Sequence, residues 1–240
     1  FMSFPRDNFT PQSLKDYQGT LGELMWLRTR PDLNFCVNVF SRFVKCASPK
    51  HVDVIRGRPL KYLNSTRDYG LVYQPGDGEW VLSGEADSDL AGDLVTSRST
   101  LAINTSLGEY GNISNAVKLE RKICTSTGQA ETYAFVRLSK EILWERLLLQ
   151  ELGFPQENAT KARSDNDGVI IQSKKQINHS EAKHYRISQA FIKQLRDDGV
   201  IDPQGVDSAA NCADMGTKAL LAGPFHRHRL TVMGPQSCPS

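Results

Sequence analysis

Apolar residues recur at helical spacing through the first 66 residues of the chain. The spacing predicts three helices, which begin at Pro11, Pro31 and Pro49. Thr10 before Pro11 is typical of a helix cap followed by a first-turn proline. In the third helix, the Gly57-Arg58-Pro59 stretch predicts a break, because a proline lacks the backbone donor and clashes with the preceding turn.

From Tyr69 the apolar spacing changes from the helical period to the two-residue period of strands. Residues 70–73, a turn around Gly76-Asp77-Gly78, and residues 80–87 have the pattern of a β-hairpin. Further strands are expected at residues 100–107, from Asn112, and through residues 122–126. The chain therefore changes from a helical part to a part that contains a sheet.

The second half of the chain alternates helices with short strands. We expect a long helix at 129–152, a short strand that ends at Asp165, and helices at 169–175, 181–196 and 208–221. The residues from Gly223 include three prolines and show little apolar periodicity, which predicts an irregular tail. The order predicts an α/β fold in three parts: a helical module (1–68), a mixed α/β domain (69–221) and the tail (222–240).

The composition supports a globular protein. Hydrophobic residues make up 39% of the chain, charged residues 23%, and the mean hydropathy is −0.41, which argues against a disordered or fibrous protein. No apolar run approaches the roughly 20 residues of a membrane-spanning helix, so we expect no membrane span. The formal net charge of +2 permits a phosphate-rich partner and does not require one.

The five cysteines are scattered and form no CxxC pair or metal-ligand spacing. They are typical of reduced thiols, so we expect an intracellular, reducing compartment, whether cytoplasm, nucleus or an organelle. The chain does not begin with Met and shows no signal peptide. Removal of a presequence and a fragment of a longer protein both fit this start.

Four acidic residues stand where carboxylates could carry chemistry. Asp87 ends an apolar strand, Glu131 opens the long helix, Asp165 lies between a strand and a helix, and Asp214 lies on the last helix. If these elements pack on one sheet, the four carboxylates can meet at one end of it. Mg²⁺ prefers hard oxygen ligands, and two ions about 4 Å apart can activate a water in phosphodiester cleavage. With 27 acidic residues in the chain, helix caps or surface charges explain the spacing equally well.

Ordered motifs then carry a resemblance to a known family. GEADSDLAGD at residues 84–93, followed by SRST at 97–100, resembles the GYSDADWAGD and RST opening of the ribonuclease H domain in copia-type LTR retrotransposon polyproteins. Four later stretches also resemble this domain: STGQAETYA at 126–134 (family SSTEAEYIA), SDND at 164–167 (CDNQ), HSEAKH at 179–184 (HSRTKH) and CADMGTKAL at 212–220 (LADIFTKPL). Residues 17–73 resemble the linker from reverse transcriptase to ribonuclease H in the same polyproteins.

The resemblance implies a ribonuclease H fold, a five-stranded mixed sheet flanked by helices with the acids at one end. The four metal-binding acids of the family fall on Asp87, Glu131, Asp165 and Asp214, with Mg²⁺ or Mn²⁺ as the cofactor. A histidine that assists product release is implied between the third and fourth acids. His179 and His184 both match, the choice between them stays open, and either could instead be a cap or surface histidine.

Several positions depart from the family pattern: Leu90 and Asn115 replace Trp, Thr132 replaces Tyr, Glu120 replaces Gln, Glu181 and Ala182 replace Arg and Thr, and Ser188 and Ala190 replace Arg and His. These departures remove basic and aromatic groups that contact phosphates or stack on bases. They weaken the expectation of hybrid binding more than the expectation of the fold. The chain also has no Y-x-D-D polymerase motif.

Two functions are therefore carried forward. The first is a metal-dependent ribonuclease that cuts RNA in RNA–DNA hybrids, with Asp87 and Asp165 bridging two ions, Glu131 holding one and Asp214 the other. The complete acidic set favours this enzyme. The second is a domesticated retroelement remnant that acts as a structural or nucleic-acid-binding subunit, with structured RNA and other proteins of a larger, ribonucleoprotein assembly as partners. The missing polymerase and the altered substrate-facing positions favour this alternative.

Overall fold

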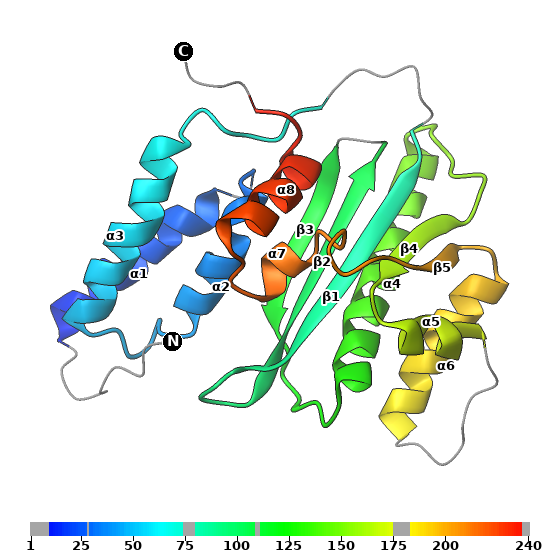
Figure 1. The fold of residues 1–240 in the computed structure, drawn as a ribbon, viewed down its shortest axis with the longest axis horizontal. Helices are drawn as coiled ribbons and strands as arrows, with labels where there is room; N and C mark the ends of the chain where they lie inside the picture. Colours follow the sequence, from blue (N-terminus) through cyan, green and yellow to red (C-terminus); the bar gives the residue numbers. More distant parts are fainter. Residues whose placement is uncertain (1–9, 28, 74–79, 109–110, 175–182, 237–240) are drawn as a thin grey trace. The chain divides into compact units, whose positions relative to one another are not determined.

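The computed structural model describes residues 10–27, 29–73, 80–108, 111–174 and 183–236 (Figure 1). The chain divides into two compact units, residues 1–70 with 236–240, and residues 71–235. The first unit is helical, and the second contains the sheet.

The second unit is built on one five-stranded sheet with the strand order β3-β2-β1-β4-β5. The strands are β1 (Leu82–Asp93), β2 (Arg98–Leu107), β3 (Asn112–Leu119), β4 (Thr160–Ser164) and β5 (Ile201–Gly205). β1, β2 and β3 pair antiparallel, whereas β4 pairs parallel with both β1 and β5. This mixed sheet with flanking helices confirms the predicted α/β class and architecture.

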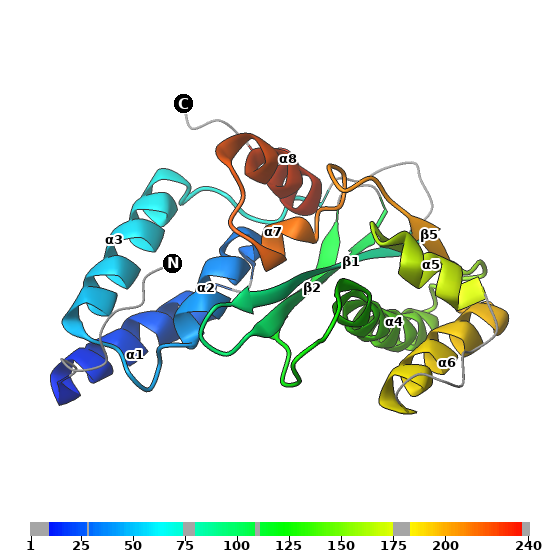
Figure 2. The same ribbon diagram turned by 60° about the horizontal axis from the view of Figure 1, so that its bottom comes forward.

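Two helices cover opposite faces of the sheet at β1 and β2. On one face, a Cβ added to Gly84 would lie 2.6 Å from Leu138 of α4 (Thr127–Glu151), so this helix packs directly on the β1 backbone. On the other face, a Cβ added to Gly216 of α7 (Asp214–Thr217) would lie 2.7 Å from the Cβ of Ala102. Side chains alternate between the faces of a strand, so β1 presents residues to both helices (Figure 2).

The main core lies on the α4 face. α5 (Asp167–Lys174) and α6 (Lys183–Asp197) pack against α4 and complete this layer. The core residues buried there include Leu82, Ala86, Ile103, Phe135, Leu138, Ile142, Ala162, Val169, Ile192 and Ile201. The long helix expected from the apolar spacing is confirmed as α4, which continues to Glu151 before Gly153 adopts a positive φ of 86°.

Three strand predictions were wrong or incomplete. The predicted hairpin is wrong, because residues 71–73 form no strand and β1 instead pairs antiparallel with β2. The turn predicted at residues 76–78 lies outside the described residues. Residues 122–126 form no strand, because the carboxylate of Glu120 accepts the N–H groups of Arg121 and Lys122 and turns the chain. β5 was not predicted; it carries Pro203, which an edge strand tolerates.

The predicted end of the chain also needs correction. The helix expected at 208–221 is reduced to the short α7, since residues 208–210 form a turn in which Asp207 accepts the N–H of Ala209 at 2.7 Å. The expected irregular tail instead contains α8 (Ala222–Met233). Val232 and Met233 of α8 are buried, and the Met233 carbonyl accepts the N–H of Val72 at 2.8 Å.

The first unit consists of α1 (Pro11–Trp26), a short 3₁₀ helix (Pro31–Leu33), α2 (Asn34–Ser41) and α3 (Pro49–Ser65). The helix starts predicted at Pro11 and Pro49 are confirmed, whereas at Pro31 a 3₁₀ helix begins and α2 follows from Asn34. Thr10 caps α1 by accepting the N–H of Ser13 at 3.0 Å, and Ser13 accepts the N–H of Thr10 in return. The core of this unit buries Tyr17, Leu21, Leu24, Ala47, Val52 and Ile55.

The predicted break in the third helix is wrong, because α3 runs through Pro59. A proline inside a helix costs about 3 kcal/mol through one lost hydrogen bond and a local clash. Pro59 is buried, and Val52 and Ile55 of the same helix lie in the core with residues of α1. This packing holds α3 together across the proline.

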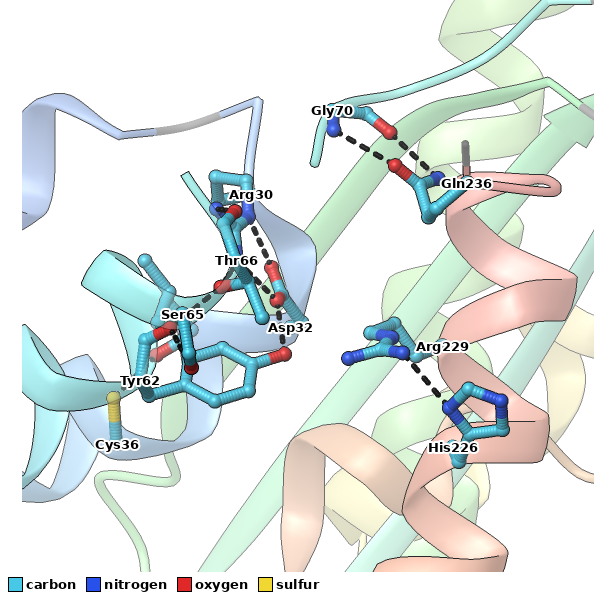
Figure 3. Close-up of polar contacts among 11 residues, drawn as sticks. Arg30, Asp32, Cys36, Tyr62, Ser65, Thr66, Gly70, His226, Arg229 and Gln236 are labelled. Carbon is cyan, nitrogen blue, oxygen red and sulfur yellow. Dashed lines mark hydrogen bonds and ion pairs between the residues drawn. The ribbon is translucent and has the colours of Figure 1, made fainter. Parts of the chain in front are cut away.

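A buried ion pair joins the segments of the first unit (Figure 3). The Arg30 guanidinium donates to both carboxylate oxygens of Asp32, at 2.9 and 2.7 Å. The same guanidinium donates to the Thr66 carbonyl at 2.8 Å, and the Tyr62 hydroxyl donates to Asp32 at 2.6 Å. The side chains of Arg30 and Asp32 are 5% and 0% exposed, so each charge is neutralised within the protein.

Candidate functional site

Three of the four predicted acids come together where β1 and β4 diverge. Asp87 lies in β1, Glu131 near the start of α4, and Asp165 directly after β4; one carboxylate oxygen from each lies within 4.8 Å of the others. β1 continues to Asp93, so Asp87 lies inside the strand and does not end it. β1 and β4 run parallel with Glu85 opposite Arg163, which brings the acids two residues further on to the same end of the pair.

Glu131 reaches this point from α4 and is held by polar groups of the strands. The backbone N–H and the hydroxyl of Ser88 donate to one of its carboxylate oxygens at 3.1 and 2.7 Å. The Ser164 hydroxyl lies 3.5 Å from the other oxygen. Burial raises the pKa of Glu131 to about 7, against the opposing effect of the Ser88 hydrogen bond.

Asp87 is the most buried of the three carboxylates, with 2% of the residue exposed. The Thr217 hydroxyl of α7 donates a short hydrogen bond to it. Burial raises the pKa of Asp87 to about 8, and the charges of Asp214 and Glu131 add to that effect. Two buried carboxylates thus sit side by side with raised pKa values, a combination that concentrates at functional sites.

Asp165 is half-buried, the least enclosed of the three acids. The Ser208 hydroxyl donates to one of its oxygens at 2.8 Å, and the Asn211 amide lies 3.5 Å from the other. Both partners come from the loop before α7. The loop therefore fixes the acid that follows β4.

Asp214 lies outside the group of three. One of its carboxylate oxygens is 2.7 Å from the ammonium of Lys218, one helical turn along the chain. Lys218 also interacts electrostatically with Asp87, Glu131 and Asp165. Asp214 thus contributes charge to the site, as its effect on the pKa of Asp87 shows, while its own oxygen is paired with the lysine.

The side chains of the two candidate histidines lie outside what the structure describes. His179 lies outside the described residues. His184 lies in the first turn of α6, and its side chain is not among those described. Their assignment as helpers of product release stays a prediction.

Sequence reasoning did not single out Ser88, Thr217 or Lys218, three of the residues that contact the acids. Each lies within a stretch that carried the family resemblance, 84–93 or 212–220. The motifs therefore contained these residues without showing what they contact. The geometry was missing, because spacing alone does not show that Thr217 bonds Asp87 whereas Lys218 pairs with Asp214.

The donor set fits a divalent cation such as Mg²⁺. All three convergent groups are carboxylates, the hard oxygen ligands that this ion prefers. Burial disfavours their ionised forms, and a bound cation would favour them.

Within the described part of the chain, no helix is both long enough and apolar enough to cross a membrane.

Comparisons with known proteins find relatives among the retrovirus-related Pol polyproteins of plant transposons and also a secreted RxLR effector protein of Plasmopara viticola, 35% identical over 130 residues, covering 53% of this chain and 89% of that protein. The chain is 30% identical over 211 residues to the retrovirus-related Pol polyprotein from transposon TNT 1-94 of Nicotiana tabacum, covering 87% of this chain and 16% of that protein. It is also 30% identical over 227 residues to the one from transposon RE2 of Arabidopsis thaliana, covering 93% and 15%. The chain thus spans about a sixth of the length of these relatives. No protein-family model matches it.

Solved structures with a similar fold share little sequence with the chain. The foamy viral protease-reverse transcriptase dRH, in complex with double-stranded DNA, matches with a TM-score of 0.50 and 12% identity, covering 85% of this chain and 34% of that one. Ribonuclease H1 of the archaeon Halobacterium salinarum matches with a TM-score of 0.41 and 16% identity, covering 57% and 93%.

The order of the strands, the motifs and the relatives agree. The sheet unit has a ribonuclease H-like fold: its five-stranded mixed sheet flanked by helices is the one that the motifs implied. The polyprotein relatives match over most of the chain, across both the helical unit and the sheet unit. The chain is therefore homologous, over most of its length, to one segment of the copia-type retrovirus-related Pol polyproteins.

Proposed function

We propose that the chain is a ribonuclease H-type endonuclease of retroelement origin that cuts the RNA strand of RNA–DNA hybrids with Mg²⁺ or Mn²⁺. One observation carries the proposal: Asp87, Glu131 and Asp165 converge within 4.8 Å at one end of a ribonuclease H-like sheet. Homology and fold make phosphodiester hydrolysis the chemistry that best fits three such carboxylates.

Asp87, Glu131 and Asp165 would hold the divalent ions. Bound there, such ions activate a water molecule and stabilise the leaving oxygen of the phosphodiester. Ser88 orients the Glu131 carboxylate, and Thr217 orients that of Asp87. These hydrogen bonds keep two buried carboxylates aimed at one point.

Asp165 and Asp214 have different positions in this scheme. Asp165 is half-buried, so it is the acid that solvent and the substrate phosphate reach most easily. We assign Asp214 as the fourth acid of the set, because its charge acts on Asp87. Its ion pair with Lys218 has to loosen before its carboxylate can serve a second ion.

The decisive experiment is cleavage of a labelled RNA–DNA hybrid by the full chain with Mg²⁺ or Mn²⁺. We expect metal-dependent cleavage of the RNA strand, with RNA duplex and DNA duplex left intact. Asp87→Asn and Asp165→Asn should each lower the rate by at least about 100-fold, the scale on which loss of one preorganised charged group acts. Glu145→Gln, which changes a buried carboxylate outside the group of three, is the matched control and should cleave normally.

The alternative function is tested by the same assay. If the wild-type chain cleaves no faster than the Asp87→Asn, Asp165→Asn double variant, the ribonuclease proposal fails. The domesticated subunit of a larger assembly then takes its place. Binding of hybrid or structured RNA without cleavage, measured by gel shift, would support that alternative.

A further inference from the structure

Three residues that each precede a site acid by two positions form one network, in which the first contacts the other two. They are Glu85 before Asp87, Arg163 before Asp165, and Cys212 before Asp214. On a strand, residues two positions apart share a face and lie about 6.6 Å apart along the chain. Glu85 therefore lies on the same face of β1 as Asp87, one step behind it, and its two partners each stand two residues before another site acid.

Glu85 is the centre of this network. One of its carboxylate oxygens lies 2.8 Å from the Arg163 guanidinium, on the residue directly opposite in β4. The other accepts two hydrogen bonds from Cys212, from the backbone N–H at 2.9 Å and from the thiol at 2.7 Å. A single side chain thus joins β1, β4 and the loop before α7.

The neighbouring strand completes the network. Asn104 of β2 is the residue opposite Glu85 on the other side of β1. Its amide donates to the Cys212 sulfur at 3.7 Å. Glu85 and Cys212 are 8% and 6% exposed, so the contacts are sheltered from water, where hydrogen bonds to charged groups are strongest.

We propose that Glu85 is a positioning residue that sets the spacing of Asp87, Asp165 and Asp214 for metal binding. The inference rests on the proposed function. The three acids come from three separate segments, and the Glu85 carboxylate is bonded to the residue two positions before Asp165 and to the residue two positions before Asp214. Without these bonds, β4 and the loop lose a common anchor to β1 immediately behind the site.

The contact between Glu85 and Cys212 is a feature of this chain and not of the family motifs. The family stretch GYSD has Tyr at the position of Glu85, and the family stretch LAD has Leu at the position of Cys212. Both residues of the contact therefore differ from the family pattern together. A carboxylate paired with a buried thiol and a guanidinium replaces two uncharged residues.

The test compares Glu85→Gln with Glu145→Gln in the full chain, by calorimetric titration with Mn²⁺. Glu145 is a second buried carboxylate, 2% exposed, which accepts the Thr105 hydroxyl at 2.6 Å on the α4 face. Glu85→Gln should weaken Mn²⁺ binding by about 10- to 100-fold, the usual effect of losing a residue that orients metal ligands. Glu145→Gln should leave Mn²⁺ affinity unchanged, and Cys212→Ser, which keeps both donors, should bind Mn²⁺ nearly as the wild type does.

Hydrogen exchange without metal gives a second, independent measurement. In Glu85→Gln the Cys212 amide loses a charged acceptor, so exchange at residues 211–214 should accelerate. Faster exchange with unchanged Mn²⁺ affinity would overturn the positioning role and leave the proposed function standing. Absence of Mn²⁺ binding to the wild type would overturn both. If Glu85→Gln does not fold, Arg163→Gln, at a side chain 33% exposed, should weaken Mn²⁺ binding in the same direction, and unchanged affinity there also overturns the role.

Discussion

Two clusters of buried charge, one in each unit, are built in opposite ways. In the helical unit, Arg30 and Asp32 neutralise each other through two hydrogen bonds. In the sheet unit, the carboxylates of Asp87 and Glu131 lie together, and their pKa values rise to about 8 and about 7. A cluster that balances its own charge serves the architecture, whereas one with surplus negative charge is suited to bind a cation.

Burial of a carboxylate alone does not make a site. Glu145 is as buried as Asp87, and burial raises its pKa to about 7, yet it does not belong to the acidic group. What distinguishes the candidate site is convergence of carboxylates from β1, α4 and the end of β4.

The largest effect on stability should come from unbalancing the helical cluster. Arg30→Met leaves Asp32 buried with the Tyr62 hydroxyl and without its cation. We expect a loss of about 3–5 kcal/mol in the free energy of unfolding, as for other broken buried ion pairs. Urea denaturation, with hydrogen exchange of α1 and α3, measures it. The double variant Arg30→Met, Asp32→Leu should recover most of the loss; if it does not, charge imbalance is not the cause.

The opposite result is expected in the acidic cluster. Asp87→Asn removes one of the mutually repelling carboxylates, so the metal-free variant should be as stable as the wild type or more stable. Mn²⁺ at a hundredfold excess over its Kd should stabilise the wild type by about 2.7 kcal/mol. That corresponds to about 5–10 °C in Tm.

Thermal melting with and without Mn²⁺ makes this measurement. Asp87→Asn should lose most of the Mn²⁺-induced shift, and Glu145→Gln should keep it. Equal shifts in the wild type and in Asp87→Asn would mean that Mn²⁺ binds elsewhere.

The parts of the fold predicted from sequence are those in which local pattern and tertiary packing agree. α4 was predicted from its apolar spacing and its glycine stop, and α1 from its cap. The break at Pro59 was wrong because local propensity favoured it while the core contacts of Val52 and Ile55 overruled it. α8 was missed because its buried Val232 and Met233 follow a run rich in His and Arg, so its apolar pattern is weak.

The acids of the candidate site could be predicted from the sequence, but their hydrogen-bond and ion-pair partners could not. Three acids meet as the motifs implied, since those motifs preserve residue identity over long separations. The ion pair of Asp214 with Lys218 could not be predicted, because a lysine side chain four residues further along the chain can equally extend into solvent. The network around Glu85 depends on the register of β1 with β4, which no local pattern contains.

The pH dependence of stability should separate the acidic cluster from the balanced one. The pKa values of Asp87 and Glu131 lie above those of the unfolded chain, so the folded protein binds more protons between about pH 4 and 8. Their stabilising contribution is complete below about pH 4 and is lost as the pH rises toward 8. Without metal, we expect the free energy of unfolding to fall steadily from pH 5 to pH 8.

Urea denaturation at several pH values tests this dependence. Mn²⁺ should reduce the share of the pH dependence of stability that arises from Asp87 and Glu131, because a bound cation favours their ionised forms. Glu145→Gln should remove the contribution of the Glu145 carboxyl to the pH dependence of stability. This loss should be the same with and without Mn²⁺, because Glu145 is outside the group of three. If Asp87→Asn leaves the metal-free dependence of stability on pH unchanged, the inferred surplus of negative charge in the acidic cluster is contradicted.

The smallest effect should come from Lys218, the cation that partly offsets the cluster. Its side chain is 44% exposed, so Lys218→Gln should change stability by less than about 1 kcal/mol. Removing this positive charge should instead favour Mn²⁺ by about 1 kcal/mol, a roughly fivefold tighter Kd, and should release the Asp214 carboxylate. Lys193→Gln is the matched control, because Lys193 forms an ion pair of the same spacing with Asp197 on α6. Calorimetric titration with Mn²⁺ should distinguish the two variants, and weaker binding in Lys218→Gln would show that the lysine helps to assemble the site instead of competing with the metal.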